Sequence, residues 1–206
     1  LEMSKDQLVN RLLSMESKVD SQLIRTGNLS ANDWEKLIES AGDISKAPLI
    51  IDDTPGISIS ELRSKCRKFK LENDLGLVII DYLQLMSGGS KRTDSRQQEI
   101  SEISRSLKAL AREMNAPVIA LSQLSRRVEE RKPAKPMLSD LRESGSIEQD
   151  ADVVMFIYRD EYYNANTNNK NLAELIISKH RNGSTGKVNL YYHHDYCFFD
   201  DCIMDI

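Results

Sequence analysis

The chain has 206 residues, enough for one sizeable globular domain, and carries a formal net charge of -4 at neutral pH. This charge predicts no general attraction to nucleic acid, so any DNA or RNA binding depends on local basic patches. The sequence has no apolar run of membrane-spanning length and no stretch that resembles a signal peptide. Its 3 cysteines, an odd number without a C-x-x-C pair, argue against a disulfide framework or a zinc site and favour a reducing cytoplasm.

The first third of the chain predicts helices and one short strand. Capping-box motifs, in which a serine is followed three residues later by Gln, Asp or Glu, predict helices after Ser4, Ser30 and Ser58. The third of these helices should run to about Asn73. Between the second and the third, the apolar run Leu49–Ile51 predicts a strand that stops at two aspartates.

The stretch Leu77–Met86 (LVIIDYLQLM) predicts a buried strand of a parallel sheet, because four apolar residues run directly into Asp81. The carboxyl end of such a strand is where open α/β sheets bind ligands. An aspartate there is the Walker B arrangement, in which the carboxylate supports Mg²⁺ on a nucleotide. The same pattern also fits a core strand with a polar end, and the stretch alone leaves both interpretations open.

The following segment predicts a helix over about Arg96–Met114 and a strand over Val118–Leu121. One apolar stripe on the helix indicates a core-packing face; it is formed by Ile100, Ile103, Leu107, Leu110, Ala111 and Met114. The strand ends at Ser122 and Gln123. An amide at this position either senses a ligand or satisfies the backbone of a loop.

Two polar segments come next. Ser125–Pro136 is basic and contains prolines, which predicts a surface loop that is either a solvated linker or faces phosphates. Its basic residues are Arg126, Arg127, Arg131, Lys132 and Lys135. Asp140–Asp152 is polar with a central Gly145, which permits a tight bend and close approach of the backbone to a ligand.

The last quarter of the chain predicts strands. Val153–Tyr158 and Leu172–Ser178 are strand-like, and Lys187–Tyr192 and Tyr196–Phe199 form a predicted hairpin. An asparagine-rich loop separates the first two. The whole pattern predicts an α/β fold: a mostly parallel sheet flanked by helices, with antiparallel strands at one edge.

Six segments, in this order, resemble the DnaB family of bacterial replicative DNA helicases: LEMSKDQLVNRLLS, LVIIDYLQLM, RQQEISEISRSLKALARE, PVIALSQLSRR, SDLRESGSIEQDADVV and ISKHRNGSTG. They cover nearly the whole chain, and the last two are the most discriminating. The resemblance implies a RecA-like core that hydrolyses ATP with Mg²⁺. It also implies a hexameric ring that moves along single-stranded DNA in the cytoplasm, with a primase and a helicase loader as partners and no membrane.

The resemblance also implies roles for individual residues. Glu2, just ahead of the first helix, matches the glutamate that orients the attacking water, and such a general base contributes roughly 10²–10⁴ in rate. Asp81 matches the Walker B aspartate, which acts through the metal's hydration shell. Gln123 matches the glutamine that senses the γ-phosphate and couples it to the DNA loops. Lys179 and Arg181 match the basic pair that reaches a neighbouring subunit's nucleotide.

The DNA contacts implied by the resemblance fall on a loop that contains Arg142, Glu143 and Gly145. Arg142 can pair with phosphate, and a backbone N–H near Gly145 can do the same. Glu143 has the wrong sign for phosphate, so we expect backbone contact or bracing of the loop from it. Arg126 and Arg127 complete the predicted DNA-binding set. No aromatic stacking platform is evident, so we expect binding that is led by the DNA backbone, independent of sequence and sensitive to salt.

One departure from the family is large. No G-x-x-x-x-G-K-[ST] motif occurs in the 206 residues, although this loop cradles the phosphates. We therefore expect residues 1–206 to be a helicase motor domain truncated at its N-terminus, which alone neither hydrolyses ATP nor unwinds DNA. Two alternatives stay open: a related RecA-fold ATPase of recombination or repair, and a non-enzymatic module that binds DNA or a loader.

Overall fold

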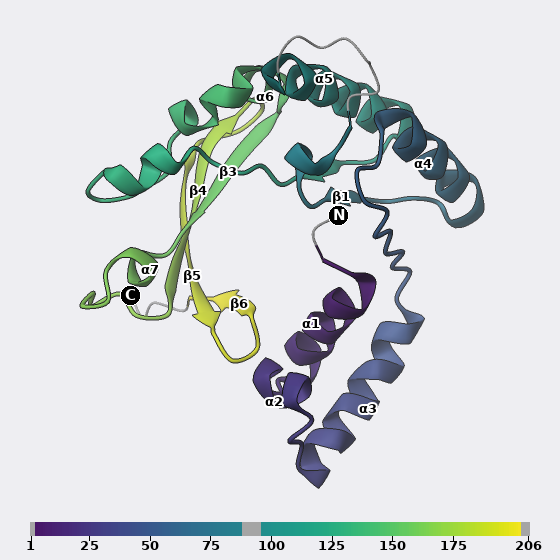
Figure 1. Ribbon diagram of the computed structural model, residues 1–206, viewed down its shortest axis with the longest axis vertical. Helices are drawn as coiled ribbons and strands as arrows, with labels where there is room; N and C mark the ends of the chain where they lie inside the picture. Colours follow the sequence, from purple (N-terminus) through teal and green to yellow (C-terminus); the bar gives the residue numbers. More distant parts are fainter. Residues whose placement is uncertain (1–2, 88–95, 203–206) are drawn as a thin grey trace. The chain divides into compact units, whose positions relative to one another are not determined.

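The structure is a computed structural model that describes residues 3–87 and 96–202 (Figure 1). The prediction for Glu2 lies outside the described residues. The chain forms two compact units. Unit 1 comprises residues 54–156 and 176–186, and unit 2 comprises residues 3–53, 157–175 and 187–202, within the described ranges.

Unit 2 begins with three helices: α1 (Lys5–Ser17), α2 (Ser21–Thr26) and α3 (Ala31–Lys46), of which α1 packs beside α3 (Figure 1). The two capping boxes predicted here are confirmed: Gln7 N–H donates to Ser4 Oγ over 3.3 Å, and α3 has the same arrangement after Ser30. No pattern in the sequence predicts α2, which is short and is capped by the Asp20 side chain.

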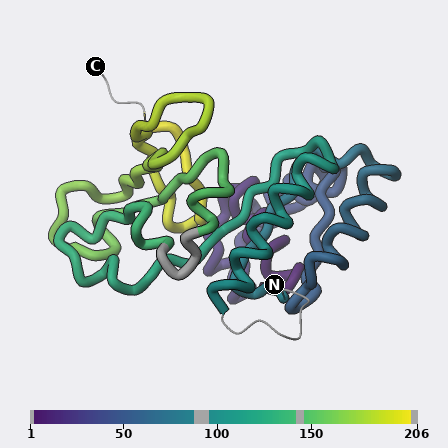
Figure 2. Tube along the Cα trace, turned by 90° about the horizontal axis from the view of Figure 1, so that it is seen from above, coloured from purple at the N-terminus to yellow at the C-terminus, as the bar shows by residue number. Residues whose placement is uncertain are grey.

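The second half of the chain supplies most of the strands. The elements are β3 (Val153–Tyr158), α7 (Asp160–Tyr163), β4 (Leu172–His180), β5 (Gly186–His193) and β6 (Phe198–Asp201). The four strands form one sheet in the order β3-β4-β5-β6. The antiparallel pairing of β5 with β6 confirms the predicted hairpin, which is drawn in yellow-green to yellow in Figure 2.

Unit 1 contains α4 (Ile59–Asn73), β1 (Val78–Ile80), the 3₁₀ helix η1 (Leu83–Leu85), α5 (Arg96–Met114) and β2 (Val118–Ala120). The strands β1 and β2 pair in parallel, and α4 packs against α5. The stripe predicted on α5 is confirmed except for Ala111: its other members lie in the unit's apolar core, whereas Ala111 is half-buried. The fully or nearly buried residues of α5 are Ile100, Ile103, Ser104, Leu107, Leu110 and Met114.

The prediction that β1 is buried on both faces is wrong for the described structure. Val78 and Ile80 point into the core, but Ile79 and its register partner Ile119 are 62% and 41% exposed. An apolar run alone does not distinguish a strand covered on one face from one covered on both.

The predicted strand at Leu49–Ile51 is also wrong. These residues adopt no regular structure, and Leu49 and Ile50 are 53% and 49% exposed. A strand needs a hydrogen-bonded neighbour, and no strand described in the structure pairs with this segment. The prediction rests only on the apolar character of these residues, which does not show whether a neighbouring strand is present.

The two polar segments are more ordered than predicted. The first contains the 3₁₀ helix η2 (Arg126–Glu130), and the second consists of the 3₁₀ helix η3 (Leu138–Ser144) followed by α6 (Gly145–Asp150). The predicted α/β class is confirmed, with parallel and antiparallel pairing both present. The described strands lie in two sheets rather than one. Among the described helices, none combines the length and apolar character that a membrane span requires.

An ionic cluster in unit 2 joins the start of α7 to the hairpin turn. Arg159 Nη2 lies 2.5 Å from Glu161 Oε1, and His194 Nε2 lies 3.0 Å from the same oxygen. The backbone N–H of Asn171 donates to Glu161 Oε2 over 2.8 Å, and the Arg159 guanidinium lies 4.0 Å from the centre of the Tyr192 ring. Burial raises the pKa of Glu161, but these hydrogen bonds outweigh it and lower the pKa to about 2.

This cluster predicts acid sensitivity of unit 2. The pKa of an ordinary glutamate is 4.5, so the stabilisation from Glu161 is present above that pH and is lost as the pH falls toward about 2. Glu161→Gln should lower the free energy of unfolding by about 2 kcal/mol at pH 7, since it weakens hydrogen bonds to a charged group. Urea unfolding between pH 2 and pH 7 measures this. The control is Glu39→Gln on the exposed side of α3, and an equal loss in both variants would contradict the prediction.

Candidate nucleotide and DNA site

Backbone hydrogen bonds connect the residues that follow the carboxyl ends of β1 and β2. Leu121 N–H donates to Ile80 O over 2.9 Å, and Leu83 N–H donates to Leu121 O over 2.9 Å. The pairing therefore continues through the residues that follow each strand. It brings Asp81, which is half-buried, and Gln123, which is exposed, to the same edge of the parallel pair. This is the edge at which parallel sheets bind ligands.

Gln84 in η1 holds the backbone at Gln123. Its Oε1 accepts from Gln123 N–H over 3.2 Å, and its Nε2 donates to Ser122 Oγ over 3.1 Å. The Gln123 side chain itself makes no hydrogen bond to any described residue, so its amide is free to meet a ligand. Sequence reasoning missed Gln84; the available signal was one polar residue inside an otherwise apolar segment.

The hydrogen bond from Gln123 to Gln84 gives a direct test of this bracing. Gln84→Leu should speed the hydrogen exchange of the Gln123 amide by about fivefold, because a typical hydrogen bond contributes about 1 kcal/mol. Amide exchange followed by NMR measures it. The Val78 amide, which donates to Pro117 O over 3.1 Å, serves as the internal control and should not change. Unchanged protection of Gln123 would mean that Gln84 does not brace it.

The predicted basic pair lies against the C-terminal end of α6. Lys179, which is inside β4 rather than after it, donates through Nζ to Glu148 O and, over 3.4 Å, to Gln149 O. Arg181 Nη2 donates to the same Gln149 carbonyl over 2.5 Å. The last carbonyls of a helix lack partners within the helix and carry partial negative charge, which favours cations at this position.

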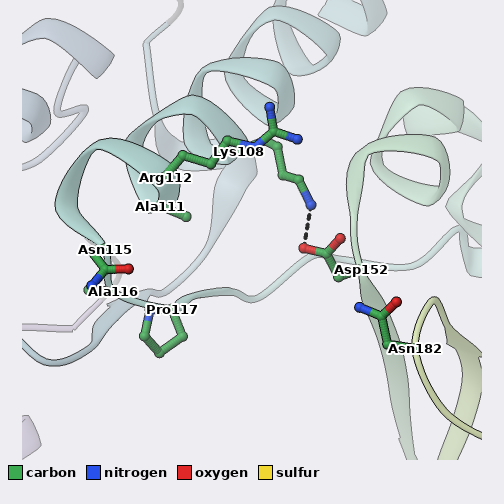
Figure 3. Close-up of a pocket in the computed structure, with 8 residues that line it drawn as sticks. All are labelled: Lys108, Ala111, Arg112, Asn115, Ala116, Pro117, Asp152 and Asn182. Atoms are coloured by element: carbon green, nitrogen blue, oxygen red, sulfur yellow. Dashed lines mark hydrogen bonds and ion pairs between the residues drawn. The ribbon is translucent and has the colours of Figure 1, made fainter.

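Asp152 lies between this pair and α5. Arg181 N–H donates to Asp152 O over 2.9 Å, Arg181 Nε lies 3.7 Å from Asp152 Oδ1, and Lys108 Nζ pairs with Oδ2. The hydrogen bond from Lys108, with the positive charges of Arg181 and Arg112, lowers the pKa of Asp152 against the opposing effect of burial. Figure 3 shows Asp152 in the wall of a pocket lined by Lys108, Ala111, Arg112, Asn115, Ala116, Pro117, Asp152 and Asn182.

The predicted DNA loop is helical in the structure, which corrects that expectation. The backbone of Arg142 and Glu143 belongs to η3, and Gly145 is the first residue of α6. The polar composition indicated a loop because the sequence offered no apolar period over so short a segment. In the next residue after Gly145, Ser146 Oγ donates to Ser101 Oγ over 2.8 Å and ties α6 to α5. The DNA-binding role of these residues stays a prediction.

In the basic segment before η3, an ion pair with Asp140 occupies Arg131. Arg131 donates to both oxygens of Asp140, over 2.7 and 2.5 Å, and to Lys135 O over 2.8 Å. The hydrogen bond from Arg131 lowers the pKa of the buried Asp140 carboxyl. Arg131 is one of the basic residues that could face phosphates by sequence, but it is committed to Asp140. Arg126 and Arg127 in η2 are exposed.

This ion pair should hold the basic segment closed. Asp140→Asn removes the charge that Arg131 faces and leaves its guanidinium without a carboxylate, which opens the segment locally. We expect trypsin to cleave within residues 126–135 about tenfold faster, as measured by mass spectrometry of timed digests. Glu129→Gln, an exposed acid of the same segment, is the matched control. Equal cleavage rates in the two variants would contradict the prediction.

The candidate residues therefore form two groups in unit 1. Asp81 and Gln123 share the sheet edge, and Lys179 and Arg181 share the end of α6; no described contact joins the two groups. Over residues 3–87 and 96–202, no cluster of three or more His, Cys, Asp or Glu side chains could hold a metal ion by itself. The described cysteines Cys66, Cys197 and Cys202 are all free thiols, as expected.

The parallel pair β1 and β2 packs with α4 and α5 in one apolar core, which is an α/β arrangement of the RecA-like class, and solved structures of DnaB-like helicases match the chain over nearly its whole length. The family described as "DnaB-like helicase C terminal domain" matches residues 1–201. The chain belongs to this family.

Curated relatives agree with this assignment. The chain is 56% identical over 196 residues to the replicative DNA helicase DnaC of Bacillus subtilis (strain 168), covering 95% of this chain and 43% of the relative. It is 57% identical over 196 residues to the replicative DNA helicase DnaB of Geobacillus stearothermophilus, with the same coverage. The chain thus spans less than half the length of these relatives.

Two solved structures are close in shape. One is described as an ATPase domain; it has a TM-score of 0.93 and 44% identity, covering 98% of this chain and 72% of that one. The other, a DnaB-like replicative helicase described with its interactions with primase, has a TM-score of 0.93 and 45% identity, covering 98% of this chain and 49% of that one.

Proposed function

We propose that this chain is the C-terminal part of a replicative DNA helicase and belongs to its motor domain. The motor couples ATP hydrolysis to movement along single-stranded DNA and to unwinding of the duplex. The family match over residues 1–201 carries this proposal. It disfavours the two alternatives, a recombination ATPase and a non-enzymatic binding module, because the relatives that match 95% of this chain are replicative DNA helicases.

The residues at the sheet edge fit an ATP and Mg²⁺ site. Mg²⁺ in nucleotide sites is held by one or two carboxylates together with waters and phosphates, so a lone Asp81 without a ligand cluster among the described residues suits it. When bound, Mg²⁺ and the nucleotide would supply the reacting phosphate and neutralise its charge. Asp81 would hold a water of the metal, and the unbonded amide of Gln123 would donate to a phosphate oxygen. Glu2 would accept the proton of the attacking water.

The remaining assignments concern the ring. Lys179 and Arg181 would act on the nucleotide of a neighbouring copy, so that each catalytic unit would be a pair of subunits. The hexameric ring itself is proposed from the family. A trans-acting arginine of this kind contributes roughly 10³–10⁵ in rate, since it stabilises charge that spreads over the phosphate oxygens.

DNA would pass along η2, η3 and the start of α6. Arg126, Arg127 and Arg142 would supply positive charge there, and a backbone N–H near Gly145 would meet a phosphate; for Glu143 we propose backbone contact or bracing of the segment. Primase is a proposed partner because one similar structure is of a helicase with primase interactions. A helicase loader and a cytoplasmic location follow from the same assignment.

The test compares the 206 residues alone with the full-length helicase. Because the chain contains no G-x-x-x-x-G-K-[ST] motif, we expect no ATP hydrolysis above background from the chain alone. The full-length protein should hydrolyse ATP faster with single-stranded DNA and unwind a forked duplex. Asp81→Asn in the full-length protein should lower its kcat by about 10²-fold or more, since it removes the metal-side charge.

Asp43→Asn, on an exposed position of α3 outside the proposed site, is the matched control for Asp81→Asn. A full-length protein without DNA-stimulated hydrolysis, or an Asp81→Asn variant as active as the control, would refute the proposed function. Robust hydrolysis by the 206 residues alone would refute the expectation that these residues need the phosphate-cradling motif for activity.

A further inference from the structure

We propose that Asp152 is a positioning residue for Arg181: it fixes the guanidinium in the orientation from which Arg181 reaches the neighbouring subunit's nucleotide. This inference rests on the proposed function and adds a residue to which sequence reasoning gave no role. Asp152 lies between the end of α6 and the start of β3, and Arg181 directly follows β4.

Arg181 is held at both its backbone and its side chain. Its N–H donates to Asp152 O over 2.9 Å, its Nε lies 3.7 Å from Asp152 Oδ1, and its Nη2 donates to Gln149 O over 2.5 Å. These contacts use one side of the planar guanidinium. Nη1 has no hydrogen bond to a described residue, so two N–H groups stay available for an oxygen of a ligand.

The Asp152 carboxylate is in turn held by α5. Lys108 pairs with Oδ2, so that Oδ1 faces Arg181, and Figure 3 shows the Lys108 side chain extending from α5 to this carboxylate. Lys108 sits on the same helix whose apolar stripe forms the core of unit 1. A chain of contacts thus leads from that helix through Lys108 and Asp152 to Arg181.

The exposure of the Asp152 and Arg181 side chains indicates that their contact orients Arg181 rather than stabilises the fold. The side chains of Asp152 and Arg181 are 55% and 45% exposed, and ion pairs this open contribute little to folding stability. Removing the Asp152 charge should therefore leave the fold intact. Without that charge, the Arg181 side chain can take other orientations. Small displacements of a catalytic group lower the reaction rate by large factors.

The experiment measures DNA-stimulated ATP hydrolysis by the full-length hexamer. Asp152→Asn should lower kcat by about tenfold while KM for ATP and the melting temperature stay unchanged, because only the orientation of Arg181 is lost. Arg181→Ala should lower kcat by about 10³-fold. The double variant should be no slower than Arg181→Ala, since Asp152 acts only through Arg181. Asp152→Glu, which keeps the charge, should recover part of the loss.

Two controls make the outcomes separable. Glu102→Gln, an exposed acid of α5 without a described ion pair, should leave kcat unchanged. Lys108→Gln keeps the Asp152 charge but frees it from α5, and should lower kcat less than Asp152→Asn; it also replaces that variant if Asp152→Asn fails to assemble. A normal kcat in Arg181→Ala would refute the proposed role of Arg181. A low kcat in Arg181→Ala with a normal kcat in Asp152→Asn and Lys108→Gln would overturn the role of Asp152 alone.

Discussion

The parallel pairing of β1 with β2 is the constraint on which the candidate site depends. Two backbone hydrogen bonds through Leu121 extend this pairing past the ends of both strands, to the two residues proposed to meet the nucleotide. Asp81 and Gln123 are far apart in sequence, and only this register brings them to one edge. The core beneath is formed largely by α5, so a disturbance of its packing would act on the site through the strands rather than through a direct contact.

The C-terminal end of α6 is the second organising point. A helix of six residues forms few of its own hydrogen bonds, and its final carbonyls need partners from elsewhere. Lys179 and Arg181 supply these partners, while Ser146 ties the first turn to α5. The backbone of the predicted DNA segment leads directly into this helix at Gly145. The two ends of α6 therefore carry residues predicted for different tasks, within about 9 Å of helix axis at 1.5 Å per residue.

Local rules predicted much of this fold, and contacts between distant segments account for the errors. Three capping boxes and the stripe on α5 were readable because each depends on neighbours within one helix. Leu49–Ile51 failed because a strand depends on a partner elsewhere in the chain. Gln84, Asp152 and the Arg131–Asp140 pair were missed or misjudged for the same reason: their roles come from contacts across 9 to 44 positions, and no periodic pattern marks them.

The basic pair shows how contacts separate residues that a motif treats alike. The ammonium of Lys179 has three N–H groups, and it directs them at the carbonyls of Glu148 and Gln149, which makes Lys179 an anchor for α6. The guanidinium of Arg181 has five N–H groups in a fixed plane, and the contacts with Gln149 and Asp152 leave those of Nη1 unused. The compact ammonium of a lysine is enough to donate to a backbone carbonyl. A side chain that contacts a carboxylate and a phosphate oxygen at once needs N–H groups on two edges of a planar group, which the guanidinium of arginine has. The two positions therefore differ in their described contacts: Lys179 directs its ammonium at carbonyls of α6, whereas the unused Nη1 of Arg181 fits the proposed contact with a phosphate.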